Sequence, residues 1–275
     1  MKKAFVIGYP IAHSKSPLIH GRWIREHGLD ASYEPIAVAP GDLPDFITRL
    51  RGGEFAGGNV TIPHKESVIG LIDAIDPLAA KIGAVNTLMV DDGKISGSNS
   101  DYLGFLANLD AGAPGWDTGI EAAVVLGAGG ASRAVLVGLI DRGVARIDLL
   151  NRSPDRAEAL AREFGPSVHP GALGDFAHRA GRAGLVVNTS AVGMDGTAFE
   201  EVDLSRLAPG AVVTDIVYTP LVTPLLAEAR ARGFASVDGL GMLLHQARPG
   251  FAAWFGRKPL VTDDLRRAVL AALGQ

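Results

Sequence analysis

The sequence predicts an α/β protein with two domains, the second of which has a doubly wound parallel sheet. Short apolar runs alternate along the chain with segments of helical spacing, as in folds built from βαβ units. The 35 glycines suit the many turns that join strands to helices in such folds. A chain of 275 residues is also long enough to form two hydrophobic cores.

Composition and charge argue against several classes of protein. The net charge of −4 gives no reason to expect nucleic acid or an anionic membrane as a partner. No apolar run is long enough to span a bilayer, and we interpret residues 1–8 as a first strand rather than a signal peptide. The chain has no cysteine, and its seven histidines lack metal-ligand spacing, so no metal site is predicted. A soluble cytoplasmic protein is the simplest interpretation.

Two serines near the N-terminus form the first candidate site. A helix is predicted to begin at Pro17 with Ser16 as its cap. The hydroxyls of Ser14 and Ser16, with Lys15 between them, could hold a carboxylate, but the same residues also fit a capped helix without a ligand. The other elements predicted for this domain are strands at 4–7, 32–38 and 84–90 and helices at 43–51 and 102–109.

A lysine in an unfavourable place forms the second candidate site. Asn59 and Thr61 lie two residues apart in an extended segment, so their side chains should face the same way. Pro63 is predicted to begin a helix that carries Lys65 in its first turn, where the helix dipole disfavours a cation. A charge placed against local preference indicates function, although an exposed surface lysine is the alternative. We expect the neighbouring His64 to be exposed.

Polar residues 98–101 are predicted to cap the helix at 102–109. Asp101 would then be a first-turn carboxylate that the helix dipole stabilises. Residues 111–115 have the composition of a linker and mark the expected domain boundary.

A glycine-rich turn at residues 127–132 organises the second domain. It lies between an apolar run at 122–126 and a helical segment at 133–140, and a second apolar run follows at 146–150. This βαβ pattern is typical of a Rossmann-type turn, in which glycines and the helix N-terminus hold a pyrophosphate. Ser132 stands where a third glycine or an alanine is usual, and a tight turn without a ligand is the alternative. The residues expected at the cofactor are Gly127, Ala128, Gly129, Gly130 and Ala131.

The end of the second strand indicates which dinucleotide binds. Proteins that bind NAD usually carry an acidic residue there, which would repel a 2′-phosphate. This chain instead has Asn151, Arg152 and Ser153, with Arg156 three residues later. Two guanidiniums and a hydroxyl can hold a phosphate through charge-assisted hydrogen bonds, so we predict NADP. Ordinary surface arginines at a helix start are the alternative.

The remaining elements complete the predicted sheet and the C-terminal helices. Thr189, at the end of a strand, could pass under a ribose or a nicotinamide at the carboxyl edge of the sheet. We predict strands at 185–188 and 211–218 and helices at 154–164, 224–233 and 261–273, with a further helix that carries His245, Gln246 and Trp254.

Seven motifs occur in the order found in shikimate dehydrogenases, a family that the whole chain therefore resembles. The motifs are Ser14-Lys-Ser-Pro17, Asn59-Val-Thr-Ile-Pro-His-Lys65, Ala84-Val-Asn-Thr87, Asn99-Ser-Asp101, Gly127–Ser132, Asn151-Arg-Ser153 and Asp238-Gly-Leu-Gly-Met-Leu-Leu-His-Gln246. The resemblance implies a substrate-binding and catalytic domain at 1–110, an NADP-binding domain at 111–238, and C-terminal helices at 239–275 that pack on the substrate domain.

The resemblance also implies roles for individual residues. Lys65 and Asp101 would form the catalytic pair, and Gly239 and Met242 would border the nicotinamide. The residues implied at the substrate are Ser14 and Ser16 at its carboxylate, with Tyr218 nearby, and Asn59, Thr61, Asn86, Asp101 and Gln246 at its ring hydroxyls. This chain departs from the family pattern at Ser100 and Ser153, where threonine is usual, but each serine keeps a hydroxyl.

The implied reaction is the reversible, NADPH-dependent reduction of 3-dehydroshikimate to shikimate in aromatic amino-acid biosynthesis. Lys65 would donate the proton, and Asp101 would orient it. A related enzyme that acts on quinate, with NAD as a further option, is one alternative, and a catalytically silent NADP-binding module is another. We expect a monomer or a homodimer.

Overall fold

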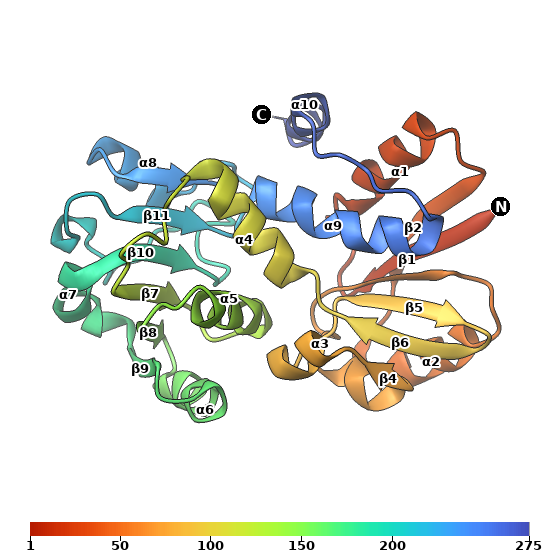
Figure 1. Ribbon diagram of the computed structural model, residues 1–275, viewed down its shortest axis with the longest axis horizontal. Coiled ribbons are helices and arrows are strands. Elements are labelled where there is room, and N and C mark those ends of the chain that lie inside the picture. Colours follow the sequence, from red (N-terminus) through yellow and green to blue (C-terminus); the bar gives the residue numbers. More distant parts are fainter. Residues whose placement is uncertain (275) are drawn as a thin grey trace. The chain divides into compact units, whose positions relative to one another are not determined.

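The computed structural model describes residues 1–274, which divide into two compact units (Figure 1). The first unit contains Met1–Asp101 together with residues 243–274, and the second contains Tyr102–Met242. The linker composition of residues 111–115 predicts a boundary after helix α4 (Asp101–Gly112). The first division lies instead at the start of α4, because α4 packs into the core of the second unit. The second division lies within helix α9 (Leu240–Phe255), four residues beyond the expected boundary after residue 238.

The first unit is built on a mixed sheet with the strand order β2-β1-β3-β5-β6-β4. Strand β1 pairs in parallel with β2 and β3, whereas β5 pairs antiparallel with β3 and β6. The strands are β1 (Lys2–Gly8), β2 (Ala31–Ala37), β3 (Gly57–Val60), β4 (Ala74–Ile75), β5 (Thr87–Asp91) and β6 (Lys94–Ser98). The helices are α1 (Ser16–Glu26), α2 (Leu43–Leu50), α3 (Pro77–Ile82) and α10 (Asp263–Ala272), with the C-terminal part of α9.

Close packing around β3 explains why this strand begins with two glycines. A Cβ atom at Gly57 would lie 2.5 Å from Nε1 of Trp254 on α9, and one at Gly58 would lie 2.3 Å from the ring of Phe5. The indole of Trp254 also donates a hydrogen bond of 2.8 Å to the carbonyl of Leu88 on β5. Helix α9 is thereby anchored against the strands that lead to Asn59.

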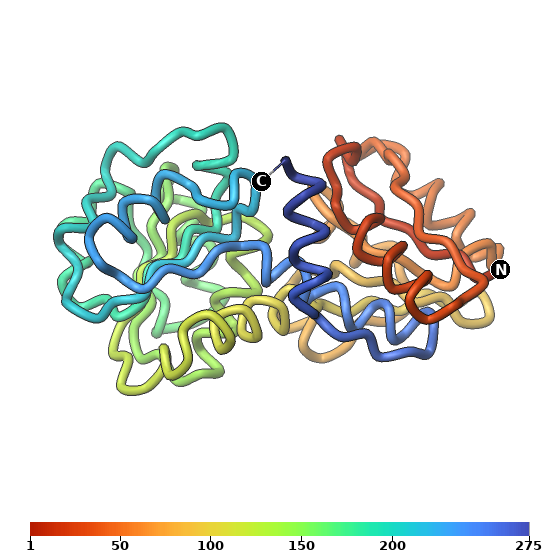
Figure 2. The backbone as a smooth tube through the Cα atoms, turned by 90° about the horizontal axis from the view of Figure 1, so that it is seen from above, coloured from red at the N-terminus to blue at the C-terminus, as the bar shows by residue number. Residues whose placement is uncertain are grey.

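The C-terminal helix α10 returns to α1, as the tube in Figure 2 shows. Nζ of Lys15 lies 3.4 Å from the carbonyl oxygen of Ala272, and the Arg22 guanidinium donates to the carbonyl of Asp264 at 3.3 Å. A cation next to the carbonyls at a helix C-terminus is the electrostatically favoured arrangement. The ammonium of Lys15 thus interacts with the C-terminus of α10.

Three local predictions for this unit were wrong. Residues 61–66 form turns, so no helix begins at Pro63, and a 3₁₀ helix follows only at Ser67–Leu71. The backbone is held in this turn because Val85 donates to the carbonyl of Lys65 at 2.8 Å. His64 is only 1% exposed, since its Nε2 lies 2.7 Å from the carbonyl oxygen of Val38. Ser16 is the first residue of α1 and not its cap, a position that Lys15 occupies.

The second unit has a doubly wound parallel sheet with the strand order β12-β11-β10-β7-β8-β9, so the predicted fold class is confirmed. The order reverses between β7 and β10, and ligands of such sheets bind at the carboxyl ends of strands at this switch point. The strands are β7 (Ala122–Leu126), β8 (Arg146–Asn151), β9 (Val168–Ala172), β10 (Ala183–Asn188), β11 (Val212–Asp215) and β12 (Ala235–Val237). The helices besides α4 are α5 (Gly130–Asp141), α6 (Pro154–Phe164), α7 (Phe176–Arg179) and α8 (Pro224–Ala231).

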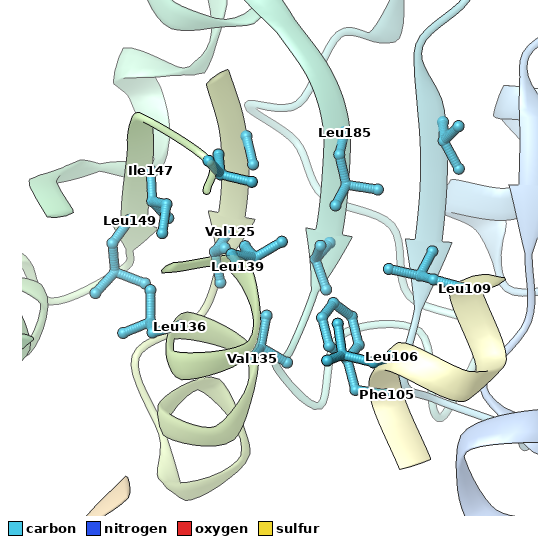
Figure 3. Packing of buried hydrophobic residues seen from close by; sticks show 14 of the residues in the cluster. Phe105, Leu106, Leu109, Val125, Val135, Leu136, Leu139, Ile147, Leu149 and Leu185 are labelled. Atoms are coloured by element: carbon cyan, nitrogen blue, oxygen red, sulfur yellow. The ribbon is translucent and has the colours of Figure 1, made fainter. Parts of the chain in front are cut away.

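Both faces of this sheet are covered, which explains the continuous apolar run of β7. Ala123 and Val125 belong to the cluster under α4 and α5, whereas Val124 and Leu126 belong to the cluster on the opposite face. Figure 3 shows the first cluster, where Phe105 and Leu106 of α4 and Val135 and Leu136 of α5 pack over the strands. No helix within residues 1–274 is long and apolar enough to cross a membrane.

Candidate active site

The first unit brings Lys65 and Asp101 together from two motifs that are 36 residues apart in the sequence. Nζ of Lys65 lies 2.5 Å from Oδ2 of Asp101, and the side chains are 16% and 9% exposed, respectively. Asp101 begins helix α4, and its backbone N–H donates to Oδ1 of Asn99 at 2.9 Å. The helix N-terminus stabilises the carboxylate, and the carboxylate in turn compensates for the burial of the ammonium.

Asn86 supplies the second partner of the Asp101 carboxylate. Its Nδ2 donates to Oδ1 of Asp101 at 2.9 Å, while its Oδ1 accepts from the backbone N–H of Ser100, also at 2.9 Å. Because a backbone N–H can only donate, this bond determines which end of the Asn86 amide is the oxygen. Gln246, from α9, extends the cluster with its Oε1, which lies 3.4 Å from both Nδ2 of Asn86 and Oγ of Ser100.

Asn59 is more deeply buried than Thr61, the other polar residue of the extended segment. Only 6% of the residue is exposed, and its Oδ1 accepts a hydrogen bond of 2.6 Å from the hydroxyl of Tyr33. Burial raises the pKa of Tyr33 well above its usual value, while a hydrogen bond with Ser16 opposes this shift. Thr61 follows the end of β3 and is half-buried.

The two serines of the first motif lie close together at the start of α1. Oγ of Ser14 lies 3.4 Å from the backbone nitrogen of Ser16. Ser14 is half-buried and Ser16 is 7% exposed. Lys15 points to α10, as described above, so the hydroxyls rather than the ammonium characterise this cluster.

The glycine turn of the second unit lies at the switch point of its sheet. A Cβ atom at Gly127 would approach the backbone nitrogen of Ser190 to 2.9 Å, so glycine is required by the contact with the end of β10. At Gly129 an added Cβ atom would meet no described atom within 4 Å, and the residue is exposed. Ser132 is buried, and its hydroxyl donates to the carbonyl of Gly129 at 2.6 Å, so the departure from glycine fits the turn.

Helix α5 begins at Gly130, within the glycine-rich segment 127–132, and its first turn contains no acidic residue within the described chain. The N-terminus of α5 therefore offers backbone N–H groups and a positive dipole to an anion. The donor set and the open approach at Gly129 fit a pyrophosphate. Ala128, Gly130 and Ala131 are partly exposed along this turn.

Two of the residues that were predicted to contact the cofactor, Asn151 and Thr189, form hydrogen bonds with the backbone of the turn and of the strand ends beside it. Oδ1 of Asn151 accepts from the backbone N–H of Ala128 at 3.1 Å, and its Nδ2 donates to the carbonyl of Ser153 at 2.9 Å. The hydroxyl of Thr189 lies 3.0 Å from the carbonyl oxygens of both Leu126 and Gly127. These bonds connect the carboxyl ends of β7, β8 and β10.

The predicted phosphate-binding residues lie together at the start of α6. Arg152, Ser153 and Arg156 are all exposed, and within residues 1–274 neither guanidinium forms an ion pair. This arrangement leaves both cations available for a phosphate. In the same unit, a Cβ atom at Gly239 would meet the carbonyl oxygen of Ile216 at 2.4 Å, and Met242 packs in the hydrophobic cluster. Tyr218 follows β11 and is half-buried, and burial raises its pKa.

Sequence reasoning gave no site role to three polar residues that lie among the site residues: Tyr33, Thr87 and Ser100. All three are buried, at 8%, 2% and 2% exposure, respectively. Thr87 and Ser100 stand inside two of the seven motifs, next to residues with assigned roles. Tyr33 could have been found only as the one large aromatic side chain in the predicted strand at 32–38.

Fold and site together define a two-unit α/β protein with a dinucleotide-binding sheet in one unit and a buried lysine–aspartate pair in the other. Family models match most of the chain. The shikimate dehydrogenase substrate binding domain matches residues 6–88, shikimate / quinate 5-dehydrogenase matches residues 117–240, and the shikimate 5′-dehydrogenase C-terminal domain matches residues 239–270. The chain belongs to the shikimate dehydrogenase family.

Individual relatives agree with this placement. The shikimate dehydrogenase (NADP(+)) of Rhizobium meliloti (strain 1021) is 53% identical over 270 residues, which cover 98% of this chain and 94% of the relative. The solved shikimate 5-dehydrogenase of Thermus thermophilus, in complex with NADP(H) and shikimate, has a TM-score of 0.87 at 36% identity and covers 99% of this chain and 100% of its own. The quinate dehydrogenase of Corynebacterium glutamicum, in complex with NAD, has a TM-score of 0.89 at 30% identity, with 98% and 99% covered.

Proposed function

We propose that this chain catalyses the reversible, NADPH-dependent reduction of 3-dehydroshikimate to shikimate, a step of aromatic amino-acid biosynthesis. The observation that carries the proposal is the buried pair of Lys65 and Asp101, with Asn86 on the second carboxylate oxygen. A charged donor held by a carboxylate among neutral hydrogen-bonding side chains suits a polyhydroxylated ring that bears a ketone. The relatives of Rhizobium and Thermus are named for this activity.

The chemistry assigned to the chain is a proton transfer at the ketone. NADPH, when bound, supplies the hydride that reduces the carbonyl carbon. An isolated lysine side chain is charged at neutral pH, so Lys65 can polarise the carbonyl and give its proton to the oxygen. Asp101 orients the ammonium through their 2.5 Å contact. In the reverse direction Lys65 accepts the proton of the ring hydroxyl.

Substrate recognition is assigned to the polar residues around this pair. The hydroxyls of Ser14 and Ser16 would hold the carboxylate, with Tyr218 as a further donor. The ring hydroxyls would be read by Thr61, Asn86, Asp101 and Gln246. The first unit would therefore be the substrate-binding domain, and residues 243–274 would belong to it.

NADP is the cofactor that the second unit fits. The turn at 127–131 and the N-terminus of α5 would hold the pyrophosphate, and Arg152, Ser153 and Arg156 would hold the 2′-phosphate. Exposed guanidiniums suit this role because they can form bidentate, charge-assisted hydrogen bonds. Gly239 and Met242 would border the nicotinamide, and Asn151 and Thr189 would keep the turn in place.

The test is a set of initial rates of cofactor reduction with shikimate and with quinate, each with NADP and with NAD. Strong activity only with shikimate and NADP is the expected result. The rival function is a quinate dehydrogenase, which the likeness to the NAD complex of the Corynebacterium enzyme favours. Comparable rates with quinate or NAD would support that rival, and no turnover in any of the four pairings would contradict both.

A cytoplasmic location and a monomeric or homodimeric state also remain our predictions.

A further inference from the structure

A chain of four buried polar side chains leads from strand β2 to the catalytic pair. Its members are Tyr33, Asn59, Thr87 and Asn86, which are 8%, 6%, 2% and 2% exposed. Buried polar groups are retained only where hydrogen bonds compensate for their desolvation. The direction of each bond in this chain can be derived from its chemistry.

The amide of Asn59 is engaged within the protein. Its Nδ2 donates to the backbone carbonyl of Asn86 at 3.0 Å and to Oγ1 of Thr87 at 3.2 Å. Since a carbonyl can only accept, the nitrogen must lie on this side, and Oδ1 must be the atom that faces the hydroxyl of Tyr33 at 2.6 Å. Both N–H donors of Asn59 are thereby used, so neither is left to donate to a substrate hydroxyl.

The direction of the hydrogen bond from Asn59 determines how Thr87 bonds to Asn86. Its Oγ1 accepts from Asn59, so its own proton is directed to Oδ1 of Asn86, which lies 2.8 Å away. That oxygen also accepts from the backbone N–H of Ser100. The opposite end of the Asn86 amide, Nδ2, then faces Oδ1 of Asp101.

We propose that Tyr33, Asn59 and Thr87 are positioning residues for the reaction proposed above, on which this inference rests. They hold Asn86 so that its amide nitrogen donates to Asp101. A carboxylate with one oxygen held in this way presents the other oxygen to Lys65 in one orientation. Asn59 would therefore act through Asn86 and not by the direct contact with a ring hydroxyl that its motif suggested.

The test compares Thr87→Val with Thr87→Ser in the full-length protein. Valine keeps the size of threonine but removes the hydroxyl, whereas serine keeps the hydroxyl. The control is Thr214→Val. Thr214 is also a buried strand threonine, its hydroxyl donates to the carbonyl of Val237 at 2.9 Å, and it lies in the other unit. The readout is the single-turnover rate constant of NADP reduction, with enzyme in excess over shikimate. A second readout is the urea midpoint of unfolding, which reports stability independently of turnover.

Thr87→Val removes the hydrogen bonds to both Asn59 and Asn86 and is expected to lower the rate constant by about tenfold to a hundredfold, as the loss of a buried hydrogen-bonding group does. Thr87→Ser and the Thr214→Val control should stay within about threefold of the parent. A purely structural role would instead lower the urea midpoint of unfolding and leave the rate constant unchanged. Equal losses in Thr87→Val and Thr87→Ser would also overturn the inference.

Tyr33→Phe gives an independent test if Thr87→Val does not fold. It removes only the hydroxyl and keeps the ring that stacks on His20 at 4.0 Å between centroids. The rate constant should again fall, by more than any change in the urea midpoint explains. If the parent is active and Tyr33→Phe keeps the parental rate constant, the inference alone is overturned. If the parent does not turn over shikimate, the proposed function is overturned and this inference with it.

Discussion

The ammonium of Lys65 and the carboxylate of Asp101 are in direct contact at 2.5 Å, and both side chains are largely buried. Burial of either charge alone would be costly, and a pair is tolerated only where geometry and further hydrogen bonds compensate. Asn86 and the start of α4 supply this compensation on the side of Asp101. Such a pair is a weak source of stability, so its presence is better explained by chemistry.

Lys65→Ala should lower kcat by about 10²–10⁴, the usual contribution of a general acid. The affinity for NADP should stay unchanged, because we assign the cofactor site to other residues. Steady-state rates and a fluorescence titration with NADP would measure the two effects. Lys94→Ala, which removes an exposed lysine of β6, is the control. Near-normal turnover in Lys65→Ala would remove Lys65 from the proposed role.

Replacing both Arg152 and Arg156 by alanine should raise KM for NADP by about tenfold to a hundredfold, since charge-assisted hydrogen bonds contribute more than neutral ones. KM for NAD should change little, because NAD has no 2′-phosphate. Arg162→Ala, an exposed arginine in the last turn of α6, is the matched control. If the double variant keeps the parental ratio of the two KM values, another group must recognise the 2′-phosphate.

His20 should make the protein less stable in mild acid. Its ring is fully buried, and desolvation lowers its pKa from 6.5 to about 3. Between these values the unfolded chain binds the proton and the folded protein does not, so the free energy of unfolding falls as the pH drops below 6.5. The expected slope is about 1.4 kcal/mol per pH unit.

His20→Phe removes this proton-binding group and keeps an aromatic ring in the cluster. Urea unfolding at about pH 7.5 and about pH 5 should show that the parent loses about 2 kcal/mol more than the variant over this interval. His20→Phe should also be tolerated, because neither ring nitrogen of His20 has a hydrogen-bond partner among the described residues. Equal losses in both proteins would show that His20 does not titrate on unfolding.

Gly58→Ala should destabilise the first unit by about 1–3 kcal/mol, the usual cost of overpacking a core. The added Cβ atom would lie 2.3 Å from the ring of Phe5, which is fully buried and packs edge-on against Phe46 and Phe55. Gly70→Ala is the matched control, since a Cβ atom there meets no described atom within 4 Å. Urea midpoints measure the difference, and equal midpoints would show that Phe5 can move aside.

The local sequence pattern was sufficient to predict elements whose ends are determined by residues close in the sequence. Helix α6 begins and ends at the predicted residues, because Pro154 suits a first turn and an amphipathic stripe follows. The parallel sheet of the second unit followed from apolar runs separated by glycine turns. The predicted helix at Pro63 failed because proline at a helix start is only a weak preference, which the backbone bond from Val85 to Lys65 overrides here.

The sequence alone determined the fold class, the glycine turn and, through its ordered motifs, the family, because these depend on periodicity and on residue types at short spacing. Tertiary structure decided which polar side chains meet. Asn59 and Thr61 look equivalent in the motif, yet Asn59 is 6% exposed and bonded to Tyr33, whereas Thr61 is half-buried. The partners of a buried amide come from strands that are distant in the sequence, and only strand pairing brings them within hydrogen-bonding distance.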